Sequence, residues 1–258
     1  MAASVDVVKS VAGLYRLMVG GVLHLTDTYV DIDGECEVEG RELVARRIHF
    51  THCKVTIKNI TFRTTEDPNG KCLHLEDCEG AELSGCTFCC RSPTTDLAPY
   101  PGTPHLAAAL VCTRSRVSVS QCQVTAPGLE ARGLVVEGGS RVTVTNTTFT
   151  STWNSGVWVQ GGGRCRLERG AVRSCGGWVV CFLLPCPRYG ALYCTTGGCL
   201  EVEDVEQEAN PRGCGVFVLH SGSRVNLDRW SGGIEARKGA HPSTQLDIDL
   251  RSGPMFKL

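Results

Sequence analysis

The chain has 258 residues, of which 42% are hydrophobic and 6% aromatic, and its formal net charge is −1. A net charge near zero provides no general attraction to nucleic acids or to anionic membranes, so composition argues against both as bulk partners. No run of 18 apolar residues is present, which argues against a transmembrane helix. We expect no membrane partner.

The first predicted element is a short amphipathic helix within residues 1–18, with Ser4 or Asp6 as its N-cap. The apolar residues at helical spacing are Val7, Val8, Val11, Leu14, Tyr15 and Met18. Residues 22–25 then begin the first strand. The helix is expected to cover the open end of the structure that follows, because an uncovered end would expose apolar side chains and a strand edge.

One eight-residue pattern, apolar-x-apolar-x-x-apolar-x-apolar, recurs along the rest of the chain. Its copies begin at Val55, Ala81, Val117, Val142 and Cys165 and, in weaker form, at Leu200 and Val225. From copy to copy the second apolar position advances by 26, 36, 25, 23, 35 and 25 residues. A repeat of about 25 residues built from short strands is typical of a solenoid, in which each coil buries its apolar face against its neighbours. We predict an all-β chain, a parallel β-helix over residues 19–258.

Stacked coils place equivalent residues above one another, about 4.8 Å apart, which is the strand spacing of a parallel sheet. The pattern therefore predicts two inward ladders. One contains Ile57, Leu83, Val119, Val144, Leu167, Val202 and Leu227. The other contains Phe62, Phe88, Val124, Phe149 and Val172.

Two repeats are about ten residues too long, which predicts insertions near residues 90–105 and 182–190. Four prolines exclude a regular strand from the first insertion. The second is unusually apolar, and its Phe182, Leu183 and Leu184 are candidate residues of an assembly interface. Loops on a rigid scaffold commonly carry binding, although long solenoids also accept insertions that have no function.

A basic residue often precedes the first inward position of the repeat. These residues are Lys54, Arg116, Arg141, Arg164 and Arg224. In stacked coils they would form a basic stripe able to hold an anionic polymer or an acidic protein surface. The alternative is a solvated face that is neutralised by Glu168, Glu203 and Asp228.

The 16 cysteines allow two interpretations. Cys86, Cys122 and Cys165 occupy inward positions of the repeat, where a free thiol packs as a small hydrophobic side chain. The alternative is a secreted chain that contains some disulfides. The beginning of the sequence lacks the pattern of a secretory signal, because charged residues interrupt its apolar stretch. We therefore expect reduced thiols and an intracellular location.

Zinc binding and sugar hydrolysis both have candidate residues but no supporting arrangement in the repeat. Cysteines and histidines with ligand-like spacing are Cys86, Cys89 and Cys90, and His49, His52 and Cys53. A structural zinc site needs two such pairs in tetrahedral geometry. Candidate carboxylate pairs for glycoside hydrolysis are Asp31 and Asp33, Asp247 and Asp249, and Glu76 and Asp77. We predict no metal, no cofactor and no catalytic residue.

In repeat length and pattern, the chain resembles the right-handed parallel β-helix, or pectin-lyase-like, superfamily. The resemblance covers most of the chain and implies a right-handed coil, but a shared fold does not imply a function. The polysaccharide lyases and polygalacturonases of the superfamily would imply an extended sugar-binding groove. The markers Asn-Thr-Asp, Asp-Asp, Gly-His-Gly and Arg-Ile-Lys are absent from this sequence.

A narrower likeness lies in the middle of the chain. Residues 85–90, 111–116 and 133–142 resemble the cysteine-rich β-helix core of the large T protein from the adenovirus early transforming region. That family includes a trimeric protein of the capsid surface. The resemblance implies a viral, intracellular, non-enzymatic protein that works through its surface, and no residue role is carried over from it.

The sequence as a whole favours a non-enzymatic structural or protein-binding β-helix of viral origin, either a virion component or a protein that binds host proteins. We expect a protein partner or self-assembly, with a homotrimer as the candidate state. The protein would lie in the host cytoplasm, in the nucleus or in the virion. The alternative is a carbohydrate-active β-helix enzyme, either a polysaccharide lyase or a glycoside hydrolase.

Overall fold

The structure is a computed structural model of the whole chain. It describes residues 7–36, 41–65, 70–91, 107–127, 131–150, 152, 154–175, 191–208, 216–219, 222–230, 234–236 and 247–251. Of residues 7, 216–219, 234–236 and 247–251 only the backbone is described.

Within these residues the strands form three parallel sheets, and we name them A, B and C. Sheet A has the order β1 (Val7–Val8), β3 (Tyr29–Asp33), β6 (Lys54–Lys58), β9 (Glu79–Ser84), β12 (Arg116–Ser120), β15 (Arg141–Thr145), β18 (Arg164–Glu168), β21 (Cys199–Glu203), β24 (Arg224–Asp228) and β26 (Asp247–Arg251). Sheet B has the order β2 (Val22–Thr26), β5 (Arg47–Thr51), β8 (Lys71–Glu76), β11 (Ala108–Thr113), β14 (Arg132–Glu137), β17 (Val157–Val159), β20 (Leu192–Thr195), β23 (Val216–Leu219) and β25 (Ile234–Ala236). Sheet C has the order β22 (Glu206–Gln207), β19 (Ala171–Arg173), β16 (Thr148–Thr150), β13 (Gln123–Thr125), β10 (Thr87–Cys89), β7 (Thr61–Thr64) and β4 (Glu42–Ala45).

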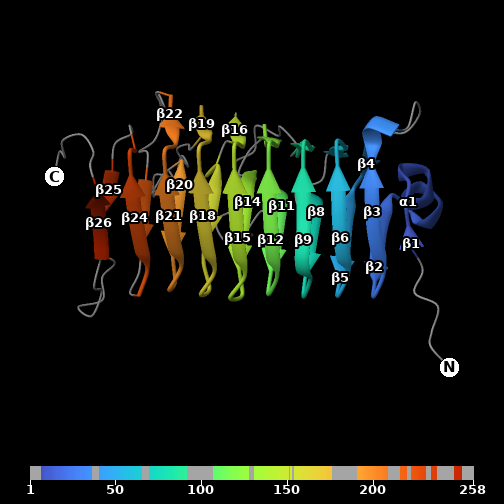
Figure 1. Cartoon of the computed structure of the whole chain (residues 1–258), viewed down its shortest axis with the longest axis horizontal. Helices are drawn as coiled ribbons and strands as arrows, with labels where there is room; N and C mark the ends of the chain where they lie inside the picture. The colour runs from blue at the N-terminus through green and yellow to red at the C-terminus, as the bar shows by residue number, and fades with distance from the viewer. Residues whose placement is uncertain are drawn as a thin grey trace, which may run out of the picture.

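Each coil of the solenoid runs through one strand of sheet B, then one of sheet A and, in most coils, one of sheet C. Figure 1 shows the coils side by side along one axis, from β2 and β3 next to the N-terminal helix to β25 and β26 at the other end. The eight-residue pattern of the sequence corresponds to a strand of sheet A, a corner and a strand of sheet C. The predicted parallel β-helix is confirmed.

Both predicted ladders are present in the interior. On sheet A, Ile57 pairs in register with Leu83, and the pairing continues through Val119 and Val144 as far as Leu227. On sheet C, Phe62 lies over Phe88 with ring centroids 5.2 Å apart and planes 3° from parallel. These side chains are almost completely buried, so each coil contributes its apolar surface to one continuous core.

Each coil turns at corners where a residue adopts the left-handed conformation. Between sheets B and A, non-glycine residues hold φ between 48° and 58°: Asp27, His52, Asp77 and Arg114. The backbone N–H of His52 donates to a carbonyl of the next coil at 3.0 Å, and that of Asp77 does so at 3.1 Å. These hydrogen bonds tie neighbouring coils together at the positions where the backbone is least favourable.

The residue after this corner points inward and forms a ladder of thiols and hydroxyls: Cys53, Cys78, Ser115 and Ser140. The Cys78 Sγ donates to two backbone carbonyls, each at 3.4 Å. The Ser115 Oγ donates to two carbonyls at 2.9 and 3.1 Å and accepts the N–H of Cys78 at 3.0 Å. Cysteine and serine can alternate here because either side chain bridges the same backbone groups. Burial raises the pKa of the Cys78 thiol to about 11.

The second corner, between sheets A and C, repeats this device. Cys86 and Cys122 are buried there, as predicted, and the N–H of Cys122 donates to the Thr147 Oγ1 at 3.2 Å. Cys165 is also buried, at the first inward position of β18. The cysteines that the structure describes are free thiols.

The N-terminal end is closed by a helix, α1 (Val11–Leu17), whose Val11 and Leu14 are fully buried. The prediction that Val7 and Val8 belong to this helix is wrong, because they form β1 and pair with β3. The N-cap is therefore Ser10, whose Oγ accepts the N–H of Gly13 at 2.9 Å. Two β-branched residues are well suited to a strand, and β1 covers the free edge of sheet A. No helix in the described part of the chain combines the length and the hydropathy needed to cross a membrane.

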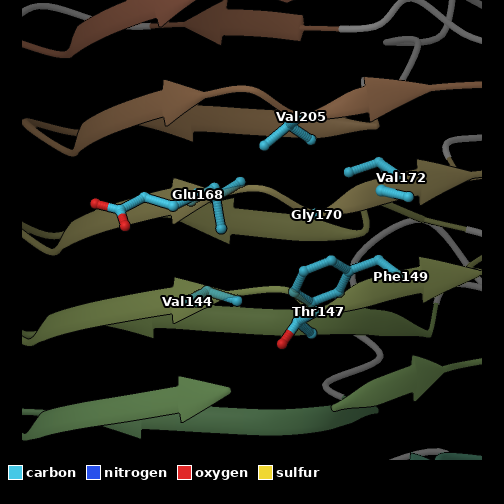
Figure 2. Close-up of a pocket in the computed structure, with 9 residues that line it drawn as sticks. Val144, Thr147, Phe149, Glu168, Gly170, Val172 and Val205 are labelled. Carbon is cyan, nitrogen blue, oxygen red and sulfur yellow. The ribbon is translucent and has the colours of Figure 1, made fainter. Parts of the chain in front are cut away.

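A small gap in the core lies beside the corner between β18 and β19. Figure 2 shows Gly170 there, between Thr147 of the preceding coil and Val205 of the next, with the Phe149 ring alongside. The cavity volume open to a water molecule is about 10 Å³, and the lining is mainly apolar. A gap of this size at most admits one water molecule, so it is a packing feature and not a ligand site.

Candidate functional site

Three of the predicted basic residues lie next to one another on the outer face of sheet A. Arg116 pairs in register with Arg141, and Arg141 pairs with Arg164. We call these three exposed residues the arginine row. Adjacent strands are about 4.8 Å apart, so like charges repeat at that interval along the axis of the solenoid. Among the described residues, none of the three makes an ion pair or a side-chain hydrogen bond.

The other two predicted basic residues lie beyond interruptions of this row. Cys199 of β21 separates Arg164 from Arg224, and the three residues share one register position. Lys54 lies on β6, two strands before β12, and its ammonium group is 5.1 Å from the centre of the Tyr29 ring. The sequence prediction thus identified one row, of which the central three members are contiguous.

The acidic residues proposed to neutralise the stripe are engaged elsewhere. Arg166 forms ion pairs with Glu168 and, at 3.2 Å, with Glu203. Arg229 lies 3.4 Å from Glu203 and 3.9 Å from Asp228. The other outward positions of β12 and β15 hold small neutral side chains, which are Ser118, Ser120, Thr143 and Thr145. On the other side of β12, β9 places Glu79 and Glu82 in register with Arg116 and Ser118.

A shallow hollow adjoins the arginine row where β15, β18 and β21 meet. Its volume open to water molecules is about 130 Å³. Its lining is Arg141, Val142, Thr143, Arg164, Cys165, Arg166, Cys199 and Glu201. Arg166 of this lining is already paired with Glu168 and Glu203, so Arg141 and Arg164 are the two arginines of the hollow without an ion pair among the described residues.

The remaining sequence candidates are not brought together in the groups that the sequence suggested, as far as the described residues show. Phe182, Leu183 and Leu184 lie outside the described residues, as do most of the two predicted insertions. Of the proposed carboxylate pairs, Asp31 and Asp33 lie on β3 and Asp247 and Asp249 on β26, at opposite ends of sheet A. Arg114 binds both Glu76 and Asp77. The proposed zinc ligands divide between the interior, where Cys53, Cys86 and Cys90 are buried, and the outer surface.

The outer face of sheet B carries a second set of polar residues that the sequence analysis did not assemble. His24, His49 and His74 stack on adjacent strands, and we call them the histidine ladder. The ring centroids of His24 and His49 are 4.9 Å apart, and those of His49 and His74 are 4.3 Å apart. Both pairs are nearly parallel, with interplanar angles of 3° and 8°.

Hydrogen bonds connect this ladder across the coils. The His49 Nε2 lies 2.9 Å from the Glu76 Oε2, and the His74 Nε2 lies 2.9 Å from the Thr113 Oγ1. The Thr113 hydroxyl donates to Glu137 at 3.1 Å. Gln160 then donates to the other Glu137 oxygen at 2.7 Å. Sheet B therefore carries linked polar side chains on both sides of an apolar stretch, Val111 and Val135, which lies in register between His74 and Trp158.

An aromatic pair continues this face toward the C-terminal coils. The Trp158 Nε1 donates to the Gln160 Oε1 at 3.0 Å, and the Arg132 guanidinium lies 4.2 Å from the centre of the indole ring. Tyr193, on the next strand, has its ring centroid 4.2 Å from that of Trp158. The network thus spans the strands from β5 to β20.

The environment lowers the pKa values of the two inner histidines. Burial, together with the positive charges of Lys71, His49 and other basic neighbours, lowers the pKa of His74 to about 3. Burial also lowers the pKa of His49, although the nearby Glu76 carboxylate opposes that shift. A neutral imidazole offers a free lone pair on one ring nitrogen.

One sequence signal could have revealed the histidine ladder. His24, His49 and His74 are 25 residues apart, which is one coil, and each lies between two apolar residues. Outward positions of a strand face the same side as their partners on the next coil, so a side chain repeated at the coil period must stack.

These features define a single-chain parallel β-helix with two differently charged outer faces. A family model described as the right handed beta helix region matches residues 46–229. This is more than half of the chain, and the protein therefore belongs to the right-handed β-helix family, as the resemblance to that superfamily implied. No curated protein matches the sequence.

Among solved structures, the chain is similar to the tailspike protein gp49 from Pseudomonas phage LKA1, with 13% identity and a TM-score of 0.32. The alignment covers 90% of this chain and 42% of the tailspike chain. The chain thus spans less than half the length of that protein.

Proposed function

We propose that this protein is a non-enzymatic binding β-helix whose arginine row contacts an acidic segment of a protein partner. The observation that supports this function is the contiguity of Arg116, Arg141 and Arg164. None of the three makes an ion pair among the described residues, and one acidic residue, Glu79 of β9, lies beside Arg116 in register. The backbone that carries the three guanidinium groups is already ordered in a sheet, so binding costs little additional backbone entropy. Each guanidinium group also presents several hydrogen-bond donors.

A labelled polyglutamate peptide is a suitable probe, and fluorescence anisotropy measures its affinity. We expect binding that weakens with salt, because exposed charges are screened. The variant R116Q/R141Q/R164Q should bind at least tenfold more weakly. The matched control K9Q/R16Q/K58Q removes three exposed positive charges elsewhere and should leave the affinity nearly unchanged.

Three outcomes contradict this proposal. Equal loss of affinity in both triple variants would mean that only overall charge matters. Absence of peptide binding together with tight binding of heparin would assign the row to a sulfated polysaccharide. Depolymerisation of an acidic polysaccharide by the purified chain would replace the binding function with the carbohydrate-active alternative.

The proposal includes self-assembly into a homotrimer and a viral role inside the host cell or in the virion. Support for the viral role comes from the likeness of residues 85–90, 111–116 and 133–142 to the adenovirus large T protein. Support for an intracellular location comes from buried free thiols at structural positions. Light scattering of the purified chain tests the assembly: a trimer is expected, and a monomer at micromolar concentration would contradict it.

A further inference from the structure

The inner part of the histidine ladder brings three metal-binding groups together. His49 on β5 and His74 and Glu76 on β8 each present one ligand atom on the outer face of sheet B, and these atoms all lie within 4.8 Å of one another. The closest pair is the His49 Nε2 and the Glu76 Oε2, at 2.9 Å. All three side chains are partly exposed, so an ion from solvent can reach them.

We propose that His49, His74 and Glu76 form a binding site for one divalent transition metal ion of the zinc type. Two imidazole nitrogens and one carboxylate oxygen are a common donor set for Zn²⁺, with a fourth position left to water. Ligand atoms about 2.0–2.1 Å from a tetrahedral ion lie about 3.3 Å from one another. The observed separations are close enough that small side-chain rotations complete the geometry.

Two properties prepare these side chains for an ion. The His49 and His74 rings are nearly parallel with centroids 4.3 Å apart, so both imidazoles already lie together on one face of sheet B. Neighbours also orient the ligands: the His74 Nε2 bonds to the Thr113 hydroxyl, and Arg114 bonds to the second oxygen of Glu76. Supporting hydrogen bonds of this kind fix ligand orientation in known metal sites.

The charges around the cluster set the strength of binding. Lys71 lies near both histidines, and its positive charge disfavours a cation there. Burial and the neighbouring Arg47 lower the pKa of Lys71, which shows that positive charge is crowded on this part of the face. Removal of the Lys71 charge is therefore expected to tighten metal binding, whereas removal of a ligand weakens it.

The experiment is a calorimetric titration of the metal-stripped full chain with ZnCl₂. We expect one ion per chain. The variant E76Q should bind more weakly by at least the roughly 10- to 100-fold typical of a lost supporting group, and H49A/H74A should not bind at this site. K71Q should bind a few-fold more tightly. H24A is the matched control, since it removes the outermost histidine of the same ladder, and its affinity should equal that of the unmodified chain.

Titration with Co²⁺ separates this site from the cysteines. Coordination by nitrogen and oxygen gives visible ligand-field absorption without the thiolate-to-cobalt charge-transfer band that cysteine ligands produce. A charge-transfer band, an affinity unaffected by H49A/H74A, or no binding by the unmodified chain would overturn the proposal. Thermal unfolding without metal identifies any variant that fails to fold. K71Q and E76Q keep the test decisive, because the first should raise and the second should lower the affinity for zinc.

Discussion

The outer faces of sheets A and B are built on the same coils, yet they use polar residues in opposite ways. On sheet A, Arg116, Arg141 and Arg164 repeat one charge on adjacent strands and make no ion pair among the described residues. On sheet B, hydrogen bonds join side chains of different kinds, such as His74, Thr113 and Glu137, across three coils. A parallel solenoid stacks whatever its sequence repeats, so repetition of one charge gives a row of like charges, whereas donors and acceptors on neighbouring coils satisfy one another.

The largest effect should come from the core that supports both faces. The fully buried ring of Phe88 stacks on Phe62, and F88A is expected to reduce the free energy of unfolding by about 3–5 kcal/mol, because a cavity replaces the ring. Chemical denaturation measures this loss. V44A, at a 39% exposed position of sheet C, is the control and should stay within about 0.5 kcal/mol. Comparable losses in both variants would contradict a shared, closely packed core.

A pH change should act on sheet B and spare sheet A. The pKa of His74 is about 3 in the folded chain, against 6.5 for an unperturbed histidine, so the unfolded state binds more protons between these pH values. Stability is therefore retained above pH 6.5 and lost as the pH falls. From pH 7 to pH 5 this one group should remove about 2 kcal/mol.

Urea unfolding of H74N at both pH values tests the sign and the source of this effect. The variant should lose most of the His74 contribution to the pH dependence, whereas the exposed control H24N should keep it. An unchanged pH dependence in H74N would mean that other groups cause the acid sensitivity.

Arg114 should contribute more to thermal stability than the residues of the arginine row, although all four side chains are exposed. It binds Glu76 and Asp77, and its hydrogen bonds lower the pKa of Asp77. R114A should lower Tm by less than the His74 effect but more than R116A does, and the difference should shrink at high salt. Differential scanning fluorimetry at two salt concentrations is sufficient. Identical Tm values for R114A and R116A would remove the distinction between the two faces.

The smallest effect should be a gain in stability on sheet A. Arg141 lies between two like charges, which are unfavourable when directly opposite on neighbouring strands. R141Q should raise stability by at most about 0.5 kcal/mol, and more clearly at low ionic strength. The same substitution at Arg166, which pairs with Glu168 and Glu203, should lower it. A loss in both variants would mean that the row is not electrostatically strained.

The sequence predicted the interior far better than the outer faces. Ladders such as Phe62 with Phe88 follow from a strict apolar period, because inward positions have only one way to be buried. The arginine row was also found, since it precedes an inward position. The histidine network was not, because hydrogen bonds such as His74 to Thr113 join residues 39 apart, across a segment that departs from the repeat.

The N-terminal helix illustrates a second limit of sequence reasoning. Val7 and Val8 fit a helical period and a strand equally well, and their assignment depends on the distant edge of β3. Local capping could not decide the helix start either, because Ser4, Asp6 and Ser10 are all suitable N-cap residues. The pairing of Val7 and Val8 with β3 determines where the strand ends and the helix begins.

The thiols at the corners give this protein a set of chemical reporters along its length. Cys53, Cys78 and Cys122 are buried in three successive coils, and each can react with an alkylating agent only when its own coil opens. Mass spectrometry after timed alkylation would therefore rank the local opening of individual coils without any added label. The order of modification would reveal whether the solenoid frays from one terminus or from both.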